Sequence, residues 1–112
     1  MALFNRKRRV FGPEMVHVGE FDPTQDSLYR NIVVTEIVVK PNRLLYVHAK
    51  SEFPVDLVVL NQTGNPVGHI DNVNDDTLGP ISTQEWTEMA IVLGVFRGDK
   101  ATVELEAWME RK

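Results

Sequence analysis

The chain contains no cysteine, which excludes a disulfide framework, thiolate metal ligands and a thiol nucleophile. A membrane-spanning helix needs about 18 consecutive apolar residues, and no apolar run in this sequence approaches that length. Its first residues lack the apolar stretch of a secretory signal. We therefore expect no transmembrane segment and, by default, a cytoplasmic location, with a virion or a cell surface as the alternatives.

The common catalytic motifs are missing as well. There is no Gly-x-Ser-x-Gly turn, no glycine-rich phosphate loop and no His-Glu-x-x-His sequence. The histidines, His17, His48 and His69, are isolated and lack the close spacing of metal ligands on one element. We predict that the protein is not an enzyme and has no cofactor, with calcium as the one metal left open below.

Size and composition indicate one ordinary globular domain. A chain of 112 residues, 43% of them apolar and 25% charged, can bury a single core. The net charge of -4 argues against duplex DNA as a partner for the body of the domain. Yet four basic residues lie together near the start, in residues 1–13, which end at a Gly-Pro pair; they are Arg6, Lys7, Arg8 and Arg9.

Residues 1–13 are therefore predicted to be a flexible basic arm, and residues 14–112 a single β-sandwich domain. Terminal segments are loose unless they dock on the domain. Such an arm can contact an anionic surface, which could be acidic lipid, nucleic acid or an acidic neighbouring subunit.

Short runs of β-branched and alternating apolar residues predict strands. Turn sequences separate these runs at intervals of about ten residues, as expected for small all-β domains. We predict an all-β fold, an antiparallel two-sheet β-sandwich of the jelly-roll kind with about seven strands. A short helix within residues 82–96 is the alternative. The predicted strands are residues 14–21, 31–39, 44–49, 55–60, 67–70, 86–96 and 101–109.

Residues 31–110 also resemble a known kind of module. The turn Lys40-Pro41-Asn42-Arg43, and then the strand that begins Pro54-Val55-Asp56-Leu57 and leads to Gly64, are similar to the small β-sandwiches of the pre-peptidase C-terminal and GOLD type. The Gly-Thr-Tyr-like entry of those modules is replaced here by Glu85-Trp86-Thr87. The resemblance implies an accessory or interaction module and carries over no catalytic residues.

Residues 71–84 lack any clear period and are predicted to form a long loop. Asp71, Asp75 and Asp76 would give this loop the oxygen ligands that calcium prefers, although their spacing differs from that of an EF-hand. Together with Trp86, the loop is also a candidate carbohydrate-binding surface. A calcium- or carbohydrate-binding module is therefore the alternative function.

Our first prediction for function rests on surplus apolar surface. Residues 31–39 and 89–96 are apolar on both strand faces, which is more than one small sandwich readily buries and indicates an interface. We predict a non-catalytic structural module that acts through a protein partner or by self-assembly as a homo-oligomer, with a viral or cell-surface subunit as a special case. The candidate aromatic anchors are Phe4, Phe11, Trp86 and Trp108.

Overall fold

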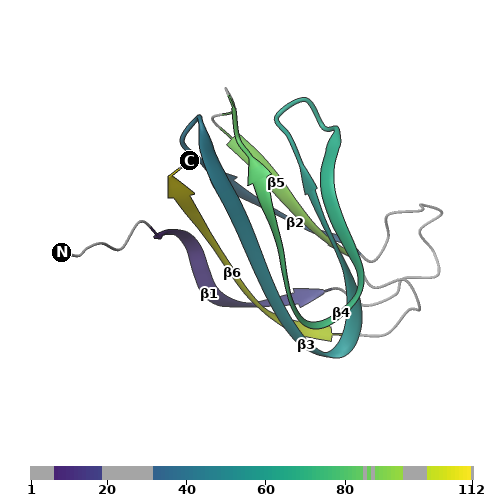
Figure 1. Cartoon of the computed structure of the whole chain (residues 1–112). Helices are drawn as coiled ribbons and strands as arrows, with labels where there is room; N and C mark the ends of the chain where they lie inside the picture. The colour runs from purple at the N-terminus through teal and green to yellow at the C-terminus, as the bar shows by residue number, and fades with distance from the viewer. Residues whose placement is uncertain (1–6, 19–31, 85, 87, 95–100, 112) are drawn as a thin grey trace.

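The computed structural model describes residues 7–18, 32–84, 86, 88–94 and 101–111, which form six β-strands (Figure 1). All strand pairs are antiparallel, so the predicted all-β antiparallel fold is confirmed. The described residues contain no helix, neither at 82–96 nor one that could span a membrane. The strands are β1 (Arg8–Val18), β2 (Ile32–Val38), β3 (Arg43–Leu60), β4 (Pro66–Ser82), β5 (Glu88–Gly94) and β6 (Ala101–Arg111).

The long strand β3 is the centre of the sheet. One of its edges pairs with β4 over nearly its full length. Its other edge pairs with β6 along residues 43–51 and with β5 along residues 56–60. β1 then pairs with β6, and β2 pairs with β5. The predicted strand at residues 55–60 is thereby confirmed as the second half of β3, which lies between β4 and β5.

The prediction of about seven strands in two sheets is not confirmed. The described strands belong to one hydrogen-bonded network, because β3 and β4 run through both of its halves without a break. The predicted strands 44–49 and 55–60 are both parts of β3, which is one reason that six strands are described and not seven. The strand order is β1-β6-β3-β4 in the first half of the network and β2-β5-β3-β4 in the second half.

One core joins the two halves. Alternate residues are buried along both parts of β3 and along β6, as the two-residue period of a strand requires. In β6 the buried residues are Val103, Leu105, Ala107 and Met109, while the glutamates and Trp108 lie on the other face. The core consists of Ile37, Val39, Leu45, Val47, Ala49, Val55, Leu57, Val59, Val73, Leu78, Ile81, Val103, Leu105, Ala107 and Met109.

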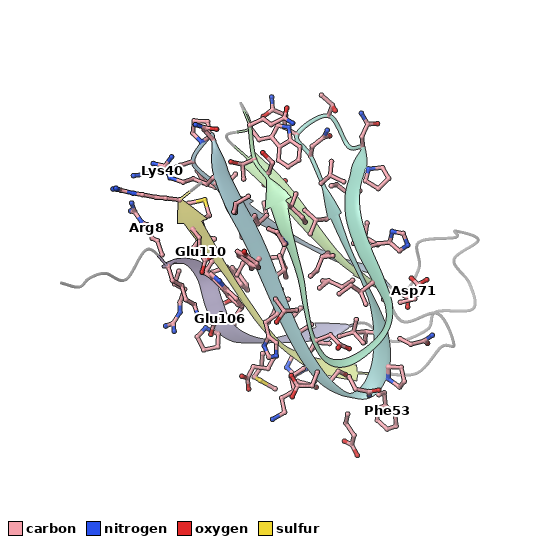
Figure 2. All side chains as sticks on the ribbon, in the orientation of Figure 1. Arg8, Lys40, Phe53, Asp71, Glu106 and Glu110 are labelled. Atoms are coloured by element: carbon pink, nitrogen blue, oxygen red, sulfur yellow. The ribbon has the colours of Figure 1, made fainter. Side chains whose placement is uncertain are left out.

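Two short connections cross between the halves at the same end of the molecule, which we call the crossing end. Residues 39–42 lead from β2 to β3, and the connection from β4 to β5, of which residues 83, 84 and 86 are described, begins beside them. Thr83 is 0% exposed and joins these connections: its Oγ1 accepts a hydrogen bond from Arg43 N at 2.8 Å and donates one to Lys40 O at 2.8 Å. At the opposite end, the bend end, β3 and β4 turn near Phe53 (Figures 1 and 2).

Two predictions about irregular segments are wrong. The predicted loop at 71–84 is mostly strand, because β4 continues to Ser82 along β3. An edge strand needs few apolar residues, and the buried apolar residues of this segment are only Val73, Leu78 and Ile81. The predicted flexible arm is also too long, since residues 8–13 belong to β1; residues 1–6 lie outside the described residues.

Candidate functional site

The predicted aromatic anchors are used within the chain wherever they are described. Phe11 and Trp86 are partly buried and pack against the core. Trp108 stacks on Tyr46, with the ring centroids 5.6 Å apart and the planes 11° from parallel. Phe4 lies outside the described residues. An aromatic ring that already packs inside the protein has less area to offer to a partner.

The Trp108 stack is built across three strands. Arg9 in β1 and Tyr46 in β3 lie directly opposite Trp108 in β6, so all three side chains share the outer face of the sheet. The Nζ of Lys7 lies 4.1 Å from the centre of the Trp108 ring. The indole is thus engaged both by the Tyr46 ring and by the Lys7 ammonium.

Charged groups surround this stack. Lys7 Nζ and Arg9 Nη2 lie 3.9 and 3.8 Å from the carboxylate oxygens of Glu106. Desolvation raises the pKa of Tyr46 above its ordinary value, and the negative charge of Glu110 and a hydrogen bond to its carboxylate raise it further. The outer face at β6 therefore holds a closed network of cations, carboxylates and two aromatic rings.

The basic residues of the chain gather beside this network. Of the seven lysines and arginines among the described residues, six lie around the end of β6, and only Lys50 lies elsewhere. Figure 2 labels Arg8 and Lys40 at this place. We call this surface the basic corner; it consists of Lys7, Arg8, Arg9, Lys40, Arg43 and Arg111.

Contacts with β6 bring the corner together. Arg8 lies opposite Met109, and Lys40 N donates a hydrogen bond to Met109 Sδ at 3.3 Å. Arg43 lies opposite Arg111 at the edge shared by β3 and β6. Of the predicted basic arm, Lys7, Arg8 and Arg9 are placed in this corner, and Arg6 lies outside the described residues.

The predicted calcium ligands lie along an exposed edge strand. β4 pairs with β3 alone, and Asp71, Asp75 and Asp76 are exposed on it. Asp75 Oδ1 is 2.6 Å from His48 Nε2. Among the described residues, no three His, Asp or Glu side chains gather closely enough to hold a metal ion. β4 has no lysine or arginine, so these aspartates make it an acidic edge.

Sequence reasoning misses Tyr46, Thr83 and the basic residues beyond the arm. Arg43 and Arg111 are far apart in the sequence, and only the pairing of β3 with β6 places them opposite each other. Thr83 follows the last residue of β4 and is one of several threonines, so only its burial identifies it. A signal for Tyr46 was available, since it lies on the non-core face of an alternating strand, as Trp108 does.

No protein-family model and no curated protein matches this chain.

Proposed function

We propose that this protein is a non-catalytic, jelly-roll-like β-sandwich that works by contact, binding copies of itself. Support for the jelly roll comes from the two strand orders, β1-β6-β3-β4 and β2-β5-β3-β4, and from the connections β2–β3 and β4–β5, which lead from one half to the other at the crossing end. A place in a larger viral or cell-surface assembly, or the accessory role implied by the resemblance to pre-peptidase C-terminal and GOLD modules, is a special case of this proposal.

The observation that carries the proposal is the opposite charge of the two edge strands. β1 and β4 are the outer strands of the half β1-β6-β3-β4. The start of β1 belongs to the basic corner, whereas β4 has three exposed aspartates and no lysine or arginine. A basic edge on one copy and an acidic edge on another attract each other, and this attraction selects orientation as well as partner.

Side chains, and not added strand pairs, would make this contact. Pro13 in β1 and Pro66 and Pro80 in β4 cannot donate backbone hydrogen bonds, and both strands carry register shifts. These features protect the edges against pairing with another strand. Because the two surfaces differ, the contact is heterologous, and it produces a ring or an open filament.

The test is the mass of the particle in solution. We expect the wild type to exceed the monomer mass of 12.8 kDa in light scattering at low salt, and to approach it as salt screens the charges. The double variant Asp71→Asn, Asp76→Asn removes two charges from the acidic edge, and we expect it to be monomeric. Asp75 is left in place because it is bonded to His48.

A matched control removes the same charge elsewhere. Glu14→Gln with Glu36→Gln also takes two negative charges from exposed residues, on β1 and β2, and we expect it to associate as the wild type does. A wild type that is monomeric at low salt and at concentrations of about 100 µM, well above an ordinary micromolar Kd, would sink the proposal.

A further inference from the structure

We propose that part of the basic corner binds the phosphate groups of a nucleic-acid strand. The residues concerned are Arg8, Lys40, Arg43 and Arg111, which we call the rim. This inference goes beyond self-association, because it assigns a second ligand, of different chemistry, to the corner. The net charge of -4 argues against a nucleic-acid partner for the domain as a whole. The fold nevertheless brings several cations together at one place, and the net charge does not report such a local cluster.

The fold places the rim side chains together at the crossing end. Arg8 lies opposite Met109, whose side chain points to the core, and Arg111 follows two residues after Met109 on the same face of β6. Arg43 lies opposite Arg111 and therefore shares this face. Lys40 is held next to them by the hydrogen bond from its backbone to Met109. Segments far apart in the sequence thus supply one cluster of positive charge.

The basic groups of the rim form no ion pair within the described part of the chain. Lys7 and Arg9, on the outer face of the same corner, have Glu106 beside them. No described carboxylate lies within 4.0 Å of the basic groups of the rim, where like charges even lie directly opposite each other at Arg43 and Arg111. Such a pair destabilises a sheet, and a bound anion would relieve it.

Arg43 is already held in position for such an anion. Its Nη1 donates hydrogen bonds to Pro41 O at 3.3 Å and to Asn42 O at 3.2 Å, and its side chain is half-buried. These bonds leave the Nε and Nη2 donors for a ligand. Three of the four rim residues are arginines, and the planar guanidinium donates two parallel hydrogen bonds to a phosphate.

A phosphate backbone fits the rim better than an apolar protein surface does. Apolar interfaces are anchored by aromatic and large aliphatic side chains, and the exposed apolar residue nearest to the rim in sequence, among the described residues, is Val38, two residues before Lys40. Contacts with phosphates need only clustered lysines and arginines, and they are independent of base sequence. Both rings of the Trp108 stack are engaged with each other, so we expect little stacking on bases.

Fluorescence anisotropy with a labelled oligothymidylate of about 20 nucleotides tests the proposal, since a strand of that length exceeds an ordinary single-strand binding site. We expect the wild-type chain to bind it at about 50 mM salt and to lose affinity steeply towards about 200 mM. Arg111→Gln should weaken binding about fivefold and lower the slope of log K against log salt by about 0.7. Lys50→Gln removes the one described cation outside the corner and should change affinity less than about twofold.

Three results would overturn the proposal. The first is no binding by the wild type at about 50 mM salt, where such contacts are strong. The second is an equal loss in Arg111→Gln and Lys50→Gln. The third is equally tight binding of polyglutamate or of phosphatidylserine vesicles, which would assign the rim to an acidic protein or a membrane. The Asp71→Asn, Asp76→Asn variant should bind the oligonucleotide at least as well as the wild type, so a failure of self-association is distinguishable from a failure here.

Discussion

The crossing end and the bend end connect the same two halves of the protein in different ways. At the bend end, β3 and β4 pass from one half to the other as continuous strands. At the crossing end, the chain returns twice through short connections, which are fixed to each other by the buried Thr83. Where no continuous strand joins the two halves, individual polar contacts must hold them together. We therefore expect substitutions at the crossing end to be costly and those at the bend end to be mild.

The largest effect is expected for Thr83→Val, which keeps the shape of the side chain and removes its hydroxyl. Arg43 N and Lys40 O would each lose a partner next to the core, and a buried polar group without a partner costs about 1–3 kcal/mol. We expect urea denaturation to give a free energy of unfolding lower by about 2–4 kcal/mol.

Thr77→Val is the matched control for this variant, since Thr77 is exposed on β4. A surface substitution of this kind changes stability by less than about 0.5 kcal/mol. Equal losses in the two variants would contradict the role that we assign to the Thr83 contacts.

A smaller loss is expected for Trp108→Ala, on the outer face near the crossing end. The variant removes the stack with Tyr46 and the contact with Lys7, which together are worth about 1–2 kcal/mol. Thermal unfolding of the monomer gives this value. If Trp108 were instead an anchor for a partner, the variant would abolish self-association at full monomer stability, and light scattering would detect this.

Phe53→Ser tests the bend end. Phe53 is a large apolar side chain that is 47% exposed at the turn of β3. We expect a change in the free energy of unfolding of less than about 0.5 kcal/mol, because the continuous strands hold this end without it. A loss as large as that of Thr83→Val would remove the contrast between the two ends.

The smallest effect is confined to alkaline pH. The pKa of Tyr46 is raised from 10.0 in the folded state, by desolvation and then by Glu110, so the folded protein holds the phenol proton more tightly than the unfolded chain does. The resulting stability is fully present below pH 10 and is lost as pH rises through the folded pKa. We expect Tyr46→Phe to reduce the fall in stability above pH 10. Unfolding curves that are parallel for the two proteins throughout this range would refute the assignment.

The sequence predicts those parts of the fold in which alternation is strong. β6 and the second half of β3 bury every second residue, and the turn between β3 and β4 has Gly64 at a φ of 85°. Residues 71–82 of β4 escape prediction as a strand because this long edge is solvated and few of its side chains reach the core. The corner escapes prediction because cross-strand pairing, and not sequence proximity, joins Arg8, Arg43 and Arg111 through β6.

The most direct test of contact between unlike edges is a charge reversal on each. One variant carries Arg8→Glu and Lys40→Glu in the basic corner, and the other carries Asp71→Lys and Asp76→Lys on β4. We expect each variant alone to be a monomer of about 12.8 kDa in light scattering at low salt, and an equimolar mixture to associate. A mixture that stays monomeric while the wild type associates, or variants that associate alone, would contradict the proposed contact.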